Sequence, residues 1–168
     1  AVTDPQDSDD VKAQKFIAAE SIPLSLLGIP GIYIHSLLGS ENDVAGMEQS
    51  GINRRINREK LSYETVVREL GDPTTLRNKV FTRFSELLRL RAANQAFSPM
   101  GEQHVLELDK RVFALERAYG GDRIVYAVNV SNEPVAVALP AAGTDLVSGA
   151  ALQENVTLQP YQFVWLKL

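Results

Sequence analysis

Residues 28–43 read GIPGIYIHSLLGSEND, and they give the clearest indication of the architecture. Glycine and proline turn signals at residues 28–31 come directly before a run of β-branched, aromatic and aliphatic side chains at residues 32–38. A run that is apolar on both faces is typical of a parallel strand covered by helices on both sides. We therefore predict a buried strand over residues 32–38 that leads into a polar loop.

A helix is predicted before this strand. It begins near Val11, is capped within the polar residues 8–10, and ends at Gly28. Pro23 should kink this helix or mark a boundary, because proline has no backbone N–H to donate. A helix followed by a strand across a Gly-Pro-Gly turn is an αβ unit.

The polar loop after the strand is followed by two longer helices. Residues 44–49 can form one helical turn inside the loop. Ser62 opens the next helix, which Gly71 ends, and Asp72-Pro73 opens a third, which Pro99 ends. The apolar face of the third helix follows Leu76, Val80, Phe84, Leu87 and Leu88.

After Pro99 the pattern changes to short strands joined by turns. Gly120-Gly121-Asp122 is a hairpin signal. The predicted strands cover residues 104–108, 112–119, 123–130, 135–139, 145–147 and 155–168. Evenly spaced short strands without a helical pattern predict an antiparallel sandwich. We place a domain boundary here, with residues 1–98 in one unit and residues 99–168 in the other.

The predicted strand at residues 32–38 has no partner among the helices around it. An unpaired buried strand leaves its backbone donors and acceptors without hydrogen bonds, which is costly. Either this strand joins the sheet formed by residues 99–168, or it pairs with a second copy, or the rest of its sheet has been removed.

The bulk composition excludes several classes of partner. The chain has 168 residues, 45% of them hydrophobic and 23% charged, with a net charge of −4 and no cysteine. We therefore expect no nucleic-acid partner and no anionic membrane partner. Two histidines without cysteine do not predict a metal site.

The N-terminus lacks a signal-peptide pattern, so we expect a cytoplasmic protein. The start at Ala1 suggests a piece of a longer protein.

These residues resemble the sucrose phosphorylase branch of glycoside hydrolase family 13, the α-amylase family. The resemblance is carried by residues 28–43 together with RRINREK at 54–60, DLVSG at 145–149 and LQPYQFVW at 158–165. It implies a parent with a (β/α)₈ barrel whose active site lies at the carboxyl ends of the strands. This chain would then be an α+β fragment: the last αβ unit and closing helices of the barrel, followed by an all-β antiparallel sandwich domain.

The resemblance also implies a reaction. One carboxylate attacks the anomeric carbon of an α-glucoside, a second acts as acid and then base, and phosphate takes the glucosyl unit as α-glucose 1-phosphate. The glucoside is sucrose, sucrose 6-phosphate or glucosylglycerate, and the letters INREK favour the glucosylglycerate type or an uncharacterised relative. In the family the catalytic carboxylates lie on earlier strands, so we expect no catalytic residue in this chain, no cofactor, and no activity of the fragment alone.

The main site candidate is Arg54, which matches the family arginine that binds hydroxyls of the glucosyl unit. A guanidinium offers several fixed donors to hydroxyls or to a carboxylate. The competing interpretation is a structural ion pair on a loop, and the neighbouring Arg55 and Arg58 remain alternatives.

Asn42, Asp43 and Asn53 are weaker candidates for substrate binding, because barrel loops after a strand build the site. Asn42 and Asp43 can equally cap the short helix near residue 44. Tyr33 and His35 lie on the predicted strand, where a core role is favoured over contact with substrate.

A second interpretation treats residues 99–168 as a carbohydrate-binding or purely structural β module. Tyr119, Tyr161 and Trp165 are its available aromatic platforms. Tyr161, Phe163 and Trp165 alternate onto one face, which favours a core role. If the barrel is incomplete, its orphaned surfaces should be apolar and should make the fragment associate with itself.

Overall fold

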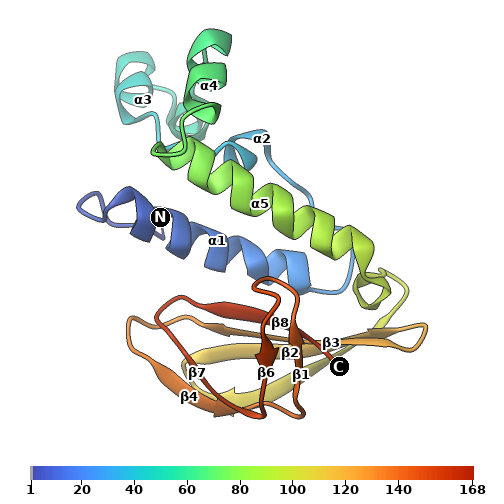
Figure 1. Ribbon diagram of the computed structural model, residues 1–168. Helices are drawn as coiled ribbons and strands as arrows, with labels where there is room; N and C mark the ends of the chain where they lie inside the picture. Colours follow the sequence, from blue (N-terminus) through green and yellow to red (C-terminus); the bar gives the residue numbers. More distant parts are fainter. Residues whose placement is uncertain (1) are drawn as a thin grey trace.

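The computed structural model describes residues 2–168, in which helices come first and strands follow (Figure 1). The helices are α1 (Asp9–Ser25), α2 (Ile34–Leu37), α3 (Val44–Ser50), α4 (Tyr63–Leu70) and α5 (Leu76–Ala93), with 3₁₀ turns η1 (Asn53–Asn57) and η2 (Gln95–Phe97). The strands are β1 (Glu102–Asp109), β2 (Val112–Tyr119), β3 (Asp122–Asn129), β4 (Val135–Ala138), β5 (Gly143–Asp145), β6 (Ala151–Leu152), β7 (Asn155–Leu158) and β8 (Phe163–Lys167).

The helix caps follow the predicted polar residues in most places. The Ser8 hydroxyl accepts a hydrogen bond from the Val11 amide at the start of α1. Pro23 lies inside the last turn of α1, and the helix ends at Ser25, three residues before Gly28. Ser62 caps α4, as predicted, with its hydroxyl accepting from the Thr65 amide.

The strands form two antiparallel sheets. The larger sheet has the order β1-β2-β3-β8-β5-β6, and β4 pairs with β7 in a second, two-stranded sheet. The antiparallel prediction is therefore confirmed. The predicted strand over residues 155–168 is two strands, β7 and β8, separated by a turn in which Tyr161 has a positive φ of 56°. The short strand β6 gave no recognisable signal in the sequence.

The larger sheet lies between two layers, with α1 and α5 on one face and the small sheet on the other (Figure 1). Strand β3 shows how the alternation of side chains builds both cores. Ile124, Tyr126 and Val128 are buried in the core shared with the helices. Val125 and Ala127 are buried in the second core, together with residues of β4 and β7.

Polar contacts also tie α1 to the sheet. The Trp165 indole N–H donates to the Ser25 hydroxyl at 2.7 Å, and the hydroxyls of Ser21 and Tyr126 are 2.7 Å apart. Burial raises the pKa of the Tyr126 hydroxyl above its usual value. Because these groups are buried, each hydrogen bond satisfies a polar atom that water cannot reach.

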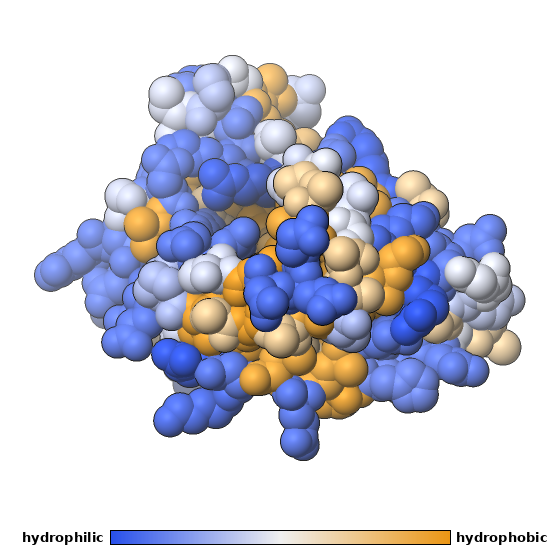
Figure 2. Space-filling model, turned by 60° about the horizontal axis from the view of Figure 1, so that its bottom comes forward, coloured by the Kyte–Doolittle hydropathy of each residue, from blue (hydrophilic) through white to orange (hydrophobic). Residues whose placement is uncertain are grey.

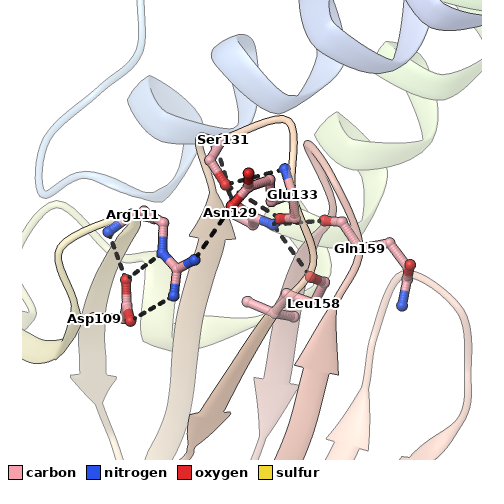
Figure 3. A network of polar contacts seen from close by, with 7 residues as sticks. All are labelled: Asp109, Arg111, Asn129, Ser131, Glu133, Leu158 and Gln159. Carbon is pink, nitrogen blue, oxygen red and sulfur yellow. Dashed lines mark hydrogen bonds and ion pairs between the residues drawn. The ribbon is translucent and has the colours of Figure 1, made fainter.

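A second polar network joins the turns at one end of the sheets (Figure 3). The buried side-chain amide of Asn129 donates to the carbonyl oxygens of Glu133, Leu158 and Gln159. Its oxygen accepts from the amide and the hydroxyl of Ser131. One buried side chain thus fixes the turn after β3 against the end of β7.

One prediction is wrong: residues 32–38 do not form a strand. Residues 29–33 have no regular structure, and Ile34–Leu37 is a single helical turn. A parallel strand needs neighbours that supply ladder hydrogen bonds, and neither sheet within residues 2–168 includes this segment. Ile32, Tyr33 and Ile34 are 37%, 46% and 55% exposed, whereas Leu37 packs against the core.

Candidate functional site

The polar segment that follows α2 folds at the end of the molecule remote from the sheets (Figure 1). Residues 51–60, which we name the arginine loop, contain η1 and pack against α3. Gly51 ends α3 in the left-handed region, with φ of 67°. This conformation suits glycine because a side chain there would be strained. The turn at Gly51 brings the arginines back alongside α3.

Asp43 connects α3 to the arginine loop. Its carboxylate accepts a hydrogen bond from the Gly46 amide at 2.8 Å, which caps α3. The same carboxylate pairs with the Arg55 guanidinium at 3.4 Å, and the Asp43 amide donates to the Ile56 carbonyl at 2.8 Å. The capping role predicted for Asp43 is therefore confirmed, and the ion pair on the loop belongs to Arg55.

Arg54 lies beside this pair but does not join it. Its side chain is exposed, and it makes no ion pair or side-chain hydrogen bond with residues 2–168. Asn42 and Asn53 are exposed as well. The five donors of the Arg54 guanidinium are consequently available to a ligand.

Tyr33 and His35 lie next to the loop rather than in the core. The Tyr33 hydroxyl donates to the Asn57 carbonyl at 3.0 Å, and its ring centroid is 5.2 Å from that of His35. His35 Nδ1 is 3.1 Å from the Ser40 hydroxyl. The core role predicted for Tyr33 is wrong, because without a strand at residues 32–38 this residue remains 46% exposed.

A groove of about 670 Å³ runs between α1 and the segment from α2 to the arginine loop. Its lining includes Lys12, Glu20, Tyr33, His35, Asn42 and Asn57. Lys12 pairs with Glu41 at 3.1 Å, and burial raises the pKa of the Glu20 carboxyl against a hydrogen bond with Ser36 that lowers it. The groove thus combines polar groups with apolar side chains such as Phe16 and Val80, and Arg54 is not among its lining residues. Sequence reasoning missed Lys12 and Glu20, since both fit an ordinary helix surface.

Residues 102–167, the strand block from β1 to β8, offer few exposed groups that could bind a ligand. Tyr161, Phe163 and Trp165 pack on the core shared with the helices, as the alternation predicted, and Trp165 lies 4.8 Å from Phe97 between ring centroids. Among aromatic residues of the described strands, Tyr119 is the one with substantial exposure. The face in Figure 2 is largely hydrophilic around an apolar area. A structural role for this block is therefore favoured over carbohydrate binding.

Within residues 2–168, no three histidine, aspartate or glutamate side chains lie close enough together to hold a metal ion. None of the helices in the same range combines the length and apolar character that crossing a bilayer requires.

Curated relatives match along nearly the whole chain. Glucosylglycerate phosphorylase of Spirochaeta thermophila is 40% identical over 175 residues, which is 92% of this chain and 30% of the relative. Glucosylglycerate phosphorylase of Escherichia coli is 36% identical over 170 residues, covering 99% of this chain and 30% of the relative. The chain therefore spans about 30% of the length of these relatives.

A family model and solved structures match the chain as well. The model described as the beta-galactosidase C-terminal domain matches residues 114–163, within the strand block. The crystal structure of AmyP in complex with maltose superposes with a TM-score of 0.72 at 16% identity, over 98% of this chain and 36% of AmyP. Trehalulose synthase MutB of Pseudomonas mesoacidophila gives 0.67 at 19% identity, over 92% and 38%. At these identities the likeness shows a shared fold.

Proposed function

Since this chain is homologous to the C-terminal region of the glucosylglycerate phosphorylases, enzymes of glycoside hydrolase family 13, we propose that it is the C-terminal part of a retaining glycoside phosphorylase. The whole protein transfers a glucosyl unit from an α-glucoside to phosphate and releases α-glucose 1-phosphate. The observation that carries this proposal is the identity of 36% to 40% with three such enzymes over 92% to 99% of the chain.

Glucosylglycerate is the substrate that we place first. Three relatives that match most of the chain carry this substrate in their names. Sucrose and sucrose 6-phosphate are the alternatives that the experiment must distinguish, because they share the glucosyl unit and differ in the leaving group.

Within this reaction Arg54 binds hydroxyls of the glucosyl unit. Its exposed guanidinium, free of partners within residues 2–168, supports this role, whereas the Arg55 guanidinium is occupied by Asp43. Asn42 and Asn53 are exposed as well, and their side-chain amides can add hydrogen bonds to the sugar. For Asp43 we propose a structural role rather than contact with substrate, because its carboxylate accepts from the Gly46 amide and pairs with Arg55.

The bond-breaking groups belong to another part of the protein in this proposal. A retaining mechanism needs a nucleophilic carboxylate and a second carboxyl group that donates and then accepts a proton. We assign neither role to a residue of this chain, and we expect the 168 residues alone to be inactive. The reaction needs phosphate as a second substrate and no cofactor.

The test is phosphorolysis by the full-length gene product. Purified protein is given phosphate with glucosylglycerate, sucrose or sucrose 6-phosphate, and glucose 1-phosphate is measured by a coupled assay, with its anomer assigned by NMR. We expect α-glucose 1-phosphate, formed fastest from glucosylglycerate. Absence of glucose 1-phosphate from all three substrates overturns the proposal, and the β-anomer overturns the retaining mechanism.

The location follows from the proposed product. A sugar phosphate is charged and is used inside the cell, so we propose a cytoplasmic protein. Cell fractionation with detection of the full-length protein tests this, and recovery from the medium or from membranes contradicts it.

A further inference from the structure

The contacts of Asp43 go beyond those of an ordinary helix cap. An aspartate that only caps a helix uses one oxygen on the amides of the first turn. Asp43 uses one oxygen on the Gly46 amide and the other on the Arg55 guanidinium, and its own amide holds the Ile56 carbonyl. Three contacts thus converge on one residue that lies twelve positions before Arg55.

Gly46 makes this arrangement possible. It is buried, and a side-chain carbon at this position would overlap the Asp43 carboxylate. The carboxylate therefore lies directly against the backbone of α3, where it can accept from the amide and still reach the arginine loop. Its side chain is 18% exposed, so the ion pair with Arg55 is partly shielded from water.

The contact with Arg55 has a consequence for its neighbour. Both arginines lie in η1, a 3₁₀ turn in which successive side chains point about 120° apart. Once Arg55 is held against Asp43 and the Ile56 carbonyl is fixed, the direction of Arg54 is set as well. Arg54 then lies on a different side of the turn from Arg55, and its side chain is exposed to solvent.

We propose that Asp43 is a positioning residue, which holds Arg55 and the backbone of η1 so that Arg54 is directed at the bound sugar. This inference rests on the proposed function, and it assigns separate tasks to two adjacent arginines. Arg55 is the internal partner that orders the loop, and Arg54 is the residue that contacts substrate.

The test is a double-mutant cycle in the full-length protein, with glucosylglycerate and phosphate as substrates. We expect Arg54→Ala to lower kcat/KM by about 100-fold, the loss of a charge-assisted contact, and Asp43→Asn to lower it by about tenfold. If Asp43 acts through Arg54, the double variant is no worse than Arg54→Ala alone. Losses that multiply overturn the proposal, because they show that Asp43 acts independently of Arg54.

Two further variants serve as a substitute and as a control for the double-mutant cycle. Arg55→Gln removes the internal ion pair without touching the cap of α3, and it takes the place of Asp43→Asn if that variant folds poorly. It should show the same non-additivity with Arg54→Ala. Glu86→Gln is the matched control, because Glu86 is an exposed carboxylate that pairs with Arg89 on α5, and its kcat/KM should be unchanged.

Hydrogen exchange measured by mass spectrometry on the same proteins separates this inference from the proposed function. Asp43→Asn should raise exchange in peptides covering residues 43–58 about tenfold and leave β3 unchanged. Unchanged exchange in an active enzyme overturns the positioning role alone. An inactive wild-type protein overturns the proposed function, and with it the role of Asp43 in directing Arg54.

Discussion

Arg117 is completely buried, and its guanidinium contacts backbone carbonyls rather than a carboxylate. It donates to the carbonyl oxygens of Ser25, Ser98 and Glu102 at 2.8–3.1 Å. Arg91 binds the carbonyls of Leu24, Gly28 and Phe97 close by. Burial and the charge of Arg91 lower the pKa of Arg117. The two arginines close the carboxyl end of α1 against the start of β1, where a cation also suits the helix dipole.

Replacing Arg117 by Met should lower the free energy of unfolding by about 3 kcal/mol, because three buried carbonyls lose their donor. Lysine cannot restore the arrangement, since one ammonium lacks the planar fork that reaches three acceptors. Urea unfolding followed by circular dichroism gives the value. Arg123→Met is the matched control, because Arg123 is half exposed in its pair with Glu116 and should lose less than about 1 kcal/mol. Equal losses of unfolding free energy for both variants would contradict a stabilising role of the three carbonyl contacts of Arg117.

Glu20 gives a pH-dependent prediction. Burial raises the pKa of its carboxyl, so folding disfavours the charged form. The contribution of the neutral Glu20 carboxyl to the free energy of unfolding is fully present below its pKa in the unfolded chain, near 4.5. It is lost as pH rises through its higher pKa in the folded chain. Glu20→Gln should therefore raise the melting temperature at pH 7, with the gain disappearing below pH 4. Melting curves from pH 3 to 8 test this, and a gain that is constant with pH contradicts it.

At the scale of elements, caps and alternation made much of the fold predictable. Ser8 and Ser62 were recognisable because their hydroxyls precede apolar periodic runs. The start predicted for the third long helix, Asp72-Pro73, is wrong, because α5 begins at Leu76 and Thr75 is its cap. The Thr75 hydroxyl also donates to the Glu69 carbonyl at 2.7 Å, a contact with α4 that local sequence does not reveal.

Thr75→Ala should destabilise the chain by about 1–2 kcal/mol, since it removes the cap of α5 and the contact with α4. For a chain of this size that corresponds to a melting temperature lower by roughly 2–8 °C. Thr82→Ala is the control, because Thr82 is exposed in the middle of α5, where alanine is the better helix former. A loss at Thr82 as large as that at Thr75 would show that the cap is unimportant.

The strand predicted over residues 32–38 failed because its formation depends on contacts with the rest of the molecule. Residues 32–38 have the composition of a buried parallel strand, but a strand is defined by neighbours that no local pattern supplies. The candidate site also depends on contacts between residues that are distant in the sequence. The sequence singled out the arginines, but which of Arg54 and Arg55 is occupied depends on Asp43, twelve residues earlier. The division at residues 98 and 99 stays a prediction, and one core runs across it from Phe84 to Trp165.

Ile29, Ile34 and Ile52 are all more than half exposed, which predicts self-association of the isolated chain. Burying an isoleucine is worth about 1.5–3 kcal/mol, so a few such contacts can hold two copies together. Light scattering should show a mass that rises with concentration, and replacing all three residues by serine should yield a monomer. Val105→Thr, an exposed site on β1, is the control and should leave association unchanged. A wild-type chain that stays monomeric at every concentration contradicts the prediction. In the full-length protein the backbone amides of these three residues should exchange more slowly than in the isolated chain, because the remainder of the protein would then cover them.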